Sequence, residues 1–325
     1  MRIMRALGAA LVAVAIALVG GVPTAVAATP QHPITEFPVF VNSWPQGITT
    51  GPDGNVWFTK SHSDRVSRIT RGGRIRNIGP RTGEIPVAIT TGPDGNLWFT
   101  EEEGNAIARL TPDGVLTQFS LPTDHDLPND ITTGPDGDLW FTEPSNNTIG
   151  RITTAGVITL FEVPTPRSFP ISITTGPDGN LWFTASSAEG VGSITPDGTF
   201  GPIYSLPGKQ AGPYGIATGP DGNLWITSGN LPRIDRMTPS GVVTVFRIRG
   251  PGFHSEEIDI TPGPDGNMWF TDAGANAIGR ITMDGRTREF PLPTADAYPS
   301  SIVAGSDGRM WFTEFGAGKI GRISV

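Results

Sequence analysis

The sequence contains no cysteine among its 325 residues. This absence excludes disulfide bonds, thiolate nucleophiles and zinc sites built on thiolates. Histidine is scarce, with four residues, and the His-Glu-x-x-His pair of zinc proteases does not occur. The Gly-x-Ser-x-Gly motif of serine hydrolases and the Gly-x-Gly-x-x-Gly loop of dinucleotide-binding folds are also missing. The common catalytic motifs therefore indicate no activity.

Positive charge is limited as well. The 23 Lys and Arg residues are outnumbered by 31 Asp and Glu, which gives a net charge of −8. A phosphate backbone and an anionic lipid surface would both be repelled by such a protein. We therefore expect neither nucleic acid nor membrane as a partner.

Only one long apolar run is present, at residues 6–19. Arg2 and Arg5 precede it, and Ala25-Val26-Ala27 offers small residues for cleavage. This pattern is typical of a secretory signal peptide. The alternative, an uncleaved anchor, is disfavoured because a bilayer span needs ~20 apolar residues. We expect residues 1–27 to be removed near Ala27 and residues 28–325 to be one secreted, monomeric domain.

Glycine and proline are abundant, with 43 and 31 residues, and they recur at fixed positions of an internal repeat. Each unit has a Gly-x-Asp-Gly turn followed by a tryptophan, at steps of 41 to 44 residues. The seven tryptophans are Trp57, Trp98, Trp140, Trp182, Trp225, Trp269 and Trp311. A period of about 42 residues is that of a β-propeller blade.

One unit divides into four short strands, here named A to D. In residues 129–170 these are 130–133, 139–143, 148–153 and 157–163, separated by turn residues. The last unit stops at strand C, residues 319–325, and residues 34–37 resemble strand D. The sequence therefore predicts an all-β, seven-bladed β-propeller of four-stranded blades, closed by the N-terminal strand. The Trp and Phe of strand B are expected to pack between blades.

Such a propeller has two different faces. The A–B and C–D turns form one, here called the turn face, where the repeated Asp residues favour a structural role over calcium binding. The B–C and D–A connections form the other, here called the variable face. Strand A begins there at Gln46, Val87, Asn129, Ile171, Tyr214, Ile258 and Ser300. Strand B ends there at Lys60, Glu101, Glu143, Ala185, Ser228, Asp272 and Glu314.

The variable face therefore carries the candidate functional residues. Gln46, Asn129, Tyr214 and Ser300 are expected to form a ligand-binding surface. An apolar patch near Tyr214, Phe253 and Phe315 would indicate a binding module. The acidic residues and His62, His125 and His254 could supply a general base or a divalent-metal site.

The units resemble those of the virginiamycin B lyase (streptogramin lyase) family. The resemblance lies in Gly-x-Asp-Gly-x-Leu-Trp-Phe-Thr-Glu, Asn-x-Ile-Gly-Arg-Ile-Thr and Phe-x-Leu-Pro-Thr, most clearly at residues 97–110, 139–153 and 268–282. It implies a seven-bladed propeller that opens cyclic depsipeptides by elimination. A base removes the proton beside the ester carbonyl while Mg²⁺ polarises that carbonyl.

The family pattern places histidines at the start of strand A in the last two blades. Here those positions hold Ile258 and Ser300, whereas the acid after strand B is kept as Asp272 and repeated as Glu314. The resemblance therefore implies that the metal side is retained and the base is lost, since neither Ile nor Ser can replace an imidazole.

Three interpretations follow. The first is a secreted module, without the catalytic histidines, that binds a small lactone or depsipeptide or an extracellular protein. The second is a carbon-oxygen lyase acting on streptogramin B lactones, with His254 or Glu257 as base and Mg²⁺ on Asp272 and Glu314. The third is a metal-dependent lactone hydrolase, for which Glu101, Asn129, Glu143 and Asp272 are candidate ligands.

Overall fold

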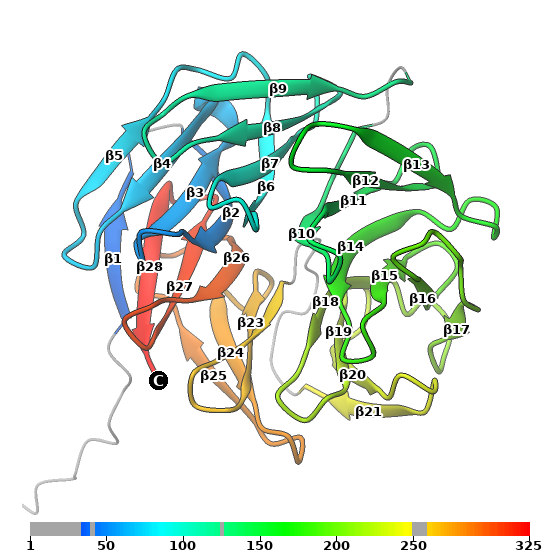
Figure 1. Cartoon of the computed structure of the whole chain (residues 1–325). Helices are drawn as coiled ribbons and strands as arrows, with labels where there is room; N and C mark the ends of the chain where they lie inside the picture. The colour runs from blue at the N-terminus through cyan, green and yellow to red at the C-terminus, as the bar shows by residue number, and fades with distance from the viewer. Residues whose placement is uncertain (1–33, 40–42, 124–126, 249–258) are drawn as a thin grey trace, which may run out of the picture. The chain divides into compact units, whose positions relative to one another are not determined.

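The computed structural model describes residues 34–39, 43–123, 127–248 and 259–325. Its strands form seven four-stranded antiparallel sheets arranged in a ring (Figure 1). All of them belong to a compact unit of residues 32–325, and residues 1–31 lie outside the described residues. The predicted all-β, seven-bladed propeller is confirmed. Among the described residues, no helix is long and apolar enough to span a membrane.

The blades follow one another along the chain. The first six are β2(Pro45–Thr50), β3(Val56–Lys60), β4(Arg65–Ile69), β5(Ile75–Ile78); β6(Pro86–Thr91), β7(Leu97–Glu101), β8(Ala106–Leu110), β9(Leu116–Ser120); β10(Ile131–Thr133), β11(Leu139–Glu143), β12(Thr148–Ile152), β13(Ile158–Glu162); β14(Pro170–Thr175), β15(Leu181–Ala185), β16(Gly190–Ile194), β17(Tyr204–Ser205); β18(Pro213–Thr218), β19(Leu224–Ser228), β20(Arg233–Met237), β21(Val243–Arg247); and β22(Ile260–Pro262), β23(Met268–Asp272), β24(Ala277–Ile281), β25(Thr287–Pro291). A short 3-10 helix, η1(Ser61–Ser63), follows β3.

The seventh blade contains both ends of the described chain. It consists of β26(Pro299–Ala304), β27(Arg309–Glu314), β28(Lys319–Ser324) and β1(Ile34–Pro38). β1 pairs antiparallel with β28, with Ile34 opposite Ile323, so blue and red strands lie side by side in Figure 1. The predicted closure by the N-terminal strand is confirmed, and it pairs a strand edge that would otherwise be open.

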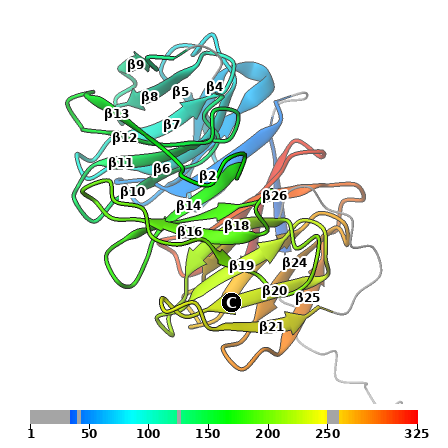
Figure 2. The ribbon, with the colours of Figure 1, turned by 90° about the vertical axis from the view of Figure 1, so that its right-hand side faces the viewer.

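The core lies between the blades. Strand A of each blade contacts strand A of the next, from β2 round to β26 and back to β2. Figure 2 shows β10, β14 and β18 following one another in this way. Trp98 of the second blade packs with Ile131, Leu139 and Phe141 of the third, and all four are buried. The expected packing of Trp and Phe between blades is therefore confirmed.

The turn face repeats one hydrogen-bond pattern. In every blade the indole Nε1 of the strand B tryptophan donates to the turn Asp, for example Trp98 to Asp94 at 3.0 Å. The same Asp94 accepts hydrogen bonds from the backbone N–H and the side-chain amide of Asn96. The expected structural role of these Asp residues is confirmed, because their hydrogen bonds join the turn to the buried tryptophan side chain.

The strand B threonine positions the start of strand A. In all seven blades its Oγ1 accepts the N–H of the residue that follows the expected first residue of strand A. Asp130 N–H, for example, donates to Thr142 at 3.1 Å. Where strand A pairs with strand B from its proline onward, the register of the two strands shifts at this point, for instance between Pro45 and Ile48. β10 consequently starts at Ile131 rather than at the predicted residue 130. β12 ends at Ile152 rather than at residue 153, and β13 spans Ile158–Glu162 rather than 157–163.

The same threonine also links neighbouring blades. Its Oγ1–H donates to a carbonyl at the start of the next strand A, such as Thr142 to Ile171 at 2.7 Å. Thr313 of the seventh blade donates to Gln46 of the first at 2.7 Å, which closes the circle. The residues at the start of the A strands are therefore held at fixed positions around the ring.

Candidate functional site

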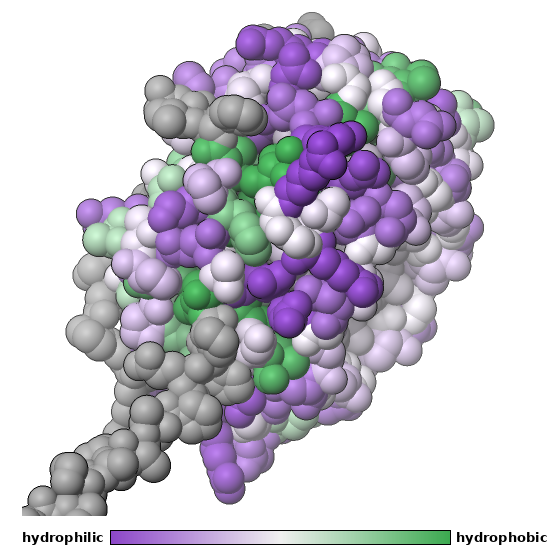
Figure 3. Space-filling view, turned by 90° about the vertical axis from the view of Figure 1, so that its left-hand side faces the viewer, coloured by the Kyte–Doolittle hydropathy of each residue, from purple (hydrophilic) through white to green (hydrophobic). Residues whose placement is uncertain are grey.

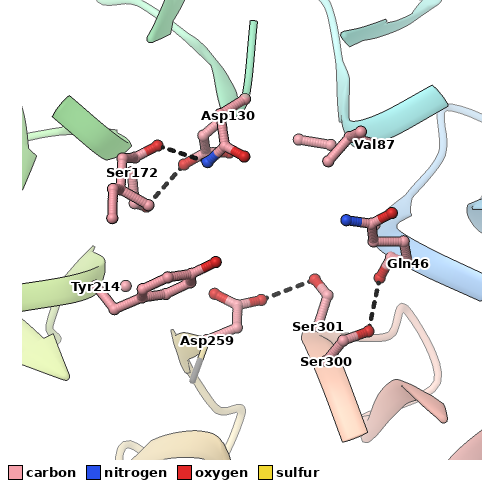
Figure 4. Close-up of a pocket in the computed structure, with 13 residues that line it drawn as sticks. Gln46, Val87, Asp130, Ser172, Tyr214, Asp259, Ser300 and Ser301 are labelled. Carbon is pink, nitrogen blue, oxygen red and sulfur yellow. Dashed lines mark hydrogen bonds between the residues drawn. The ribbon is translucent and has the colours of Figure 1, made fainter. Parts of the chain in front are cut away.

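A cavity of about 120 Å³, lined by both polar and apolar residues, lies where the seven A strands begin. It is lined by Gln46, Gly47, Val87, Ala88, Asn129, Asp130, Ile171, Ser172, Tyr214, Gly215, Asp259, Ser300 and Ser301. In Figure 4 the Tyr214 hydroxyl and the Gln46 amide point into this space from different blades. The volume suffices for several water molecules or the end of a side chain. A larger ligand would therefore have to rest on the rim.

All four residues of the expected ligand-binding surface line this cavity. The ring brings together Gln46, Tyr214 and Ser300, each the second residue of its strand A, and Asn129, which lies two residues before β10. Asn129 uses its amide Nδ2–H to bind the Ile171 carbonyl at 3.0 Å. Their role in binding a ligand stays a prediction.

Two aspartates of the cavity were missed by the sequence analysis. Asp130 in the third blade and Asp259 in the sixth each directly follow the expected first residue of strand A, which is Asn129 or Ile258. Asp130 Oδ2 accepts the Ser172 hydroxyl at 2.7 Å and the Ile173 N–H at 2.9 Å. The signal that could have found them is an acid at a position where other repeats have Gly, Ala or Ser.

Asp259 repeats this arrangement three blades later. Its Oδ2 accepts the Ser301 hydroxyl at 2.8 Å and the Ile302 N–H at 3.0 Å, and its Oδ1 accepts the Ile260 N–H at 2.8 Å (Figure 4). Burial raises the pKa of Asp259 to about 6, and the Asp130 charge adds to this rise. The hydrogen bonds act in the opposite direction. Burial likewise raises the pKa of Asp130.

The acids that end strand B have another environment. Glu101, Glu143, Asp272 and Glu314 are fully buried, and none of them lines the cavity. Glu101 accepts the Gln118 side-chain amide at 2.7 Å, and Asp272 accepts the Ala275 N–H at 2.8 Å. Burial raises the pKa of Glu101 to about 7 and that of Glu314 to about 8, and it raises the pKa of Asp272 as well.

These carboxylates do not by themselves fit a metal centre. Within the described ranges, no three His, Cys, Asp or Glu residues are grouped so that they could hold an ion. Calcium and magnesium both require several oxygen ligands around one point. The assignment of Asp272, Glu314, Glu101 and Glu143 as metal ligands stays a prediction.

The sequence indicated two candidate bases on the loop before strand A of the sixth blade. His254 and Glu257 lie outside the described residues, as do His125, Phe253 and Ile258. Of the four histidines, His62 alone lies in the described part of the chain, and its ring packs on Trp44 at 4.6 Å between centroids.

The position at which the resemblance expects a histidine in the seventh blade is buried. Ser300 is 7% exposed, and its Oγ is 2.8 Å from Thr313 Oγ1. It also donates to the Gln46 carbonyl at 3.3 Å. Ser300 thus supports the contact between the seventh and first blades.

Comparison with solved structures identifies close relatives. A structure described as a streptogramin B lyase is 36% identical, with a TM-score of 0.84, and the match covers 90% of this chain and 97% of that one. The selenomethionine form of virginiamycin B lyase from Staphylococcus aureus is 35% identical, with the same TM-score, 90% coverage of this chain and 99% of that one. A catalytically inactive histidine-to-alanine variant of that enzyme with quinupristin is 36% identical, with equal TM-score and coverage.

Sequence comparison gives the same family. Among curated proteins, none matches this chain. A family profile, that of the virginiamycin B lyase family, matches residues 24–202 and 173–325, which together include every described strand. The resemblance inferred from the repeat is confirmed, and the chain belongs to the virginiamycin B lyase family.

Proposed function

We propose that this chain is a secreted, ligand-binding member of its family that does not catalyse the lyase reaction through the usual histidines. The observation that carries the proposal is the position of Ser300 and the contacts of its hydroxyl. Ser300 occupies a position where the family pattern has a base, and its hydroxyl is committed to Thr313 and Gln46. A serine in such contacts has neither the pKa nor the freedom to remove a proton from a ligand.

The cavity supports a binding role. It combines hydroxyl, amide and carboxyl groups from several blades, and the inter-blade hydrogen bonds fix their positions. Preorganised polar groups of this kind orient a ligand at little entropic cost. The ligand we favour is a small lactone, a depsipeptide or a peptide.

The second candidate function is a lyase that acts on streptogramin B. It is favoured by the 36% identity to a streptogramin B lyase over nearly the whole of both chains. Asp259 is then the described residue to test as a base, because it lines the cavity and its pKa is about 6. His254 and Glu257 stay alternative candidates. In that case Asp272 and Glu314 would be partial ligands of a Mg²⁺ ion, and the chemistry that such an ion would supply is polarisation of the ester carbonyl.

One incubation separates these functions. The protein is mixed with a streptogramin B and Mg²⁺, with a chelator control, and the products are separated by mass-resolved chromatography. We expect unchanged substrate. A new species of the same mass would establish elimination and overturn the proposal, whereas the gain of one water would establish hydrolysis.

A matched pair of variants then tests the base. Asp259→Asn removes the candidate base. Asp130→Asn makes the same change in the third blade, where Asp130 accepts the equivalent serine hydrogen bond. If any turnover is found, loss in the first variant alone assigns the base to Asp259. Equal loss in both variants indicates a structural role.

A further inference from the structure

A set of apolar residues lies on the variable face, each directly before the proline that precedes or begins strand A. Trp44, Leu127, Phe169 and Tyr298 are 44%, 36%, 43% and 43% exposed. Ile85 occupies the same position in the second blade. Together these five residues, here called the apolar arc, belong to consecutive blades from the seventh through the first to the fourth.

The backbone is strained at four of the five arc residues, Ile85 being the exception. Trp44, Leu127, Phe169 and Tyr298 have φ values of +46°, +48°, +55° and +52°. Bulky residues rarely adopt this left-handed conformation, and a residue before proline favours extended backbone instead. The fifth blade has Gly212 at the same position, with φ of +48°. Glycine therefore fits this backbone, yet four blades carry a large apolar residue there.

A hydrogen bond to the backbone carbonyl recurs at this position. The carbonyl of the arc residue accepts the N–H of the residue after strand B, as in Ser61 to Trp44, Ser186 to Phe169 and Phe315 to Tyr298 at 3.0 to 3.1 Å. The same bond runs from Gly229 to Gly212 at 2.9 Å. Glu102 N–H binds the Ile85 carbonyl in the same way at 2.9 Å although Ile85 lacks a positive φ, and Leu127 has a positive φ although Pro144, the residue after its strand B, has no N–H to donate. The hydrogen bond therefore does not require the left-handed conformation. Strain retained at exposed positions is a feature of ligand sites.

Charge beside the arc indicates what it would bind. A hollow of about 420 Å³ is lined by Trp44 and His62 of the first blade, Ile85, Glu102 and Glu103 of the second, and Phe315 of the seventh. Trp44 lies 5.5 Å from the Phe315 ring, between centroids, so the apolar wall is aromatic. Glu102 and Glu103 line the same hollow, and both are exposed. A cation can interact with carboxylates and an aromatic face together.

We propose that the apolar arc is the specificity-determining surface for a compact peptide that carries both apolar side chains and a basic group. The apolar side chains rest on Trp44, Phe169 and Tyr298. The basic group enters the hollow beside Glu102 and Glu103, and a small polar group reaches the central cavity. This inference rests on the proposed binding function and adds to it the chemical class of the ligand.

The protein contains its own reporter for this test. Of its eight tryptophans, all described, seven are at most 2% exposed and only Trp44 is accessible. The probes are three cyclic hexapeptides with the same apolar residues and a single Arg, Gln or Glu. We expect the Arg peptide to change Trp44 emission and acrylamide quenching, and to bind about tenfold more tightly than the Gln peptide. Binding of the Glu peptide as tight as that of the Arg peptide would overturn the proposal.

Variants separate a recognition role from a structural one. Phe169→Gly and Tyr298→Gly are expected to keep or raise the melting temperature and to weaken the Arg peptide about tenfold, measured by calorimetry. Val157→Gly, at a 62% exposed position on the turn face, is the matched control and should leave affinity unchanged. A large fall in melting temperature for the arc variants, or affinity equal to that of the control, would overturn the inference.

The acidic pair provides an independent arm. Exchange of both Glu102 and Glu103 for Gln should remove the preference for the Arg peptide over the Gln peptide and leave the Gln peptide unaffected. A retained preference contradicts the proposed site for the basic group. If neither the peptides nor a streptogramin B binds, the proposed function itself fails, whereas binding that ignores the arc overturns this inference alone.

Discussion

The two faces of the propeller use the same scaffold in different ways. On the turn face, backbone and side chains repeat together, and every strand B tryptophan bonds the turn aspartate. On the variable face, a backbone hydrogen bond repeats, as from Ser61 to Trp44 and from Gly229 to Gly212, while the side chains differ. Repetition of both indicates a role in stability. Repetition of backbone alone leaves side chains available for recognition.

Surface composition fits this division. Seen from the side of β1 and β5, hydrophobic areas are small and separated by hydrophilic ones (Figure 3). Exposed valines do occur on the turn face, at Val115, Val157 and Val242, each after the glycine of a C–D turn. They are isolated side chains, of the kind that soluble proteins tolerate.

The largest expected effect distinguishes a buried from an exposed tryptophan. Trp98→Ala should lower the free energy of unfolding by about 3–5 kcal/mol, because it opens a cavity between the second and third blades. Trp44→Ala should lower it by less than about 1 kcal/mol. Denaturant unfolding measures both, and similar losses would remove the distinction between the faces.

The next effect concerns the buried acid Glu314. Its pKa of about 8 lies above the value of 4.5 expected when unfolded, so the folded state retains a proton that the unfolded state loses. Stability should therefore fall as pH rises from about 4.5 to 8. Glu314→Gln should flatten this slope and add up to about 3 kcal/mol at pH 7. Unfolding at pH 5 and pH 8 tests it, and an unchanged slope would contradict the assignment.

A smaller loss is expected at the turns. Asp265 accepts the Trp269 indole at 3.0 Å and the Asn267 backbone and amide groups. Asp265→Ala should cost about 1–3 kcal/mol, since a buried indole N–H loses its acceptor. Peptide affinity should not change, and calorimetry beside thermal unfolding checks both. Weakened binding would assign a functional role to the turn face.

The smallest effect is expected where glycine replaces an arc residue. Tyr298→Gly relieves left-handed strain but frees the unfolded chain, so the free energy of unfolding should change by no more than about 1 kcal/mol. Gly212 shows that the backbone accepts glycine. A loss above about 2 kcal/mol in urea unfolding would show that the ring contributes to packing.

Much of this organisation could be predicted from the sequence. The tryptophan period gave the number of blades because each unit buries one indole against its neighbour. Gln46 and Tyr214 were expected on one surface because the first residues of inner strands converge in a closed ring. Strand limits were off by one residue where side-chain hydroxyls, such as that of Thr142, replace ladder partners.

The apolar arc could not be predicted in the same way. A residue before proline is expected to be extended. Tyr298 instead adopts positive φ while its carbonyl accepts the Phe315 N–H across the blade. Such tertiary constraints leave no local pattern. Asp130 and Asp259 were not predicted because each directly follows the expected first residue of strand A, and only the closed ring shows that this second position also lines the cavity.

The most direct test of the central claim is a hydrogen-exchange footprint of the bound Arg peptide. The account predicts slower amide exchange at the start of the A strands and in the loops that hold the arc, including residues 43–47, 169–173 and 297–302. The Asp-Gly turns, such as residues 92–96, should be unaffected. Protection confined to those turns would contradict the assignment of recognition to the variable face.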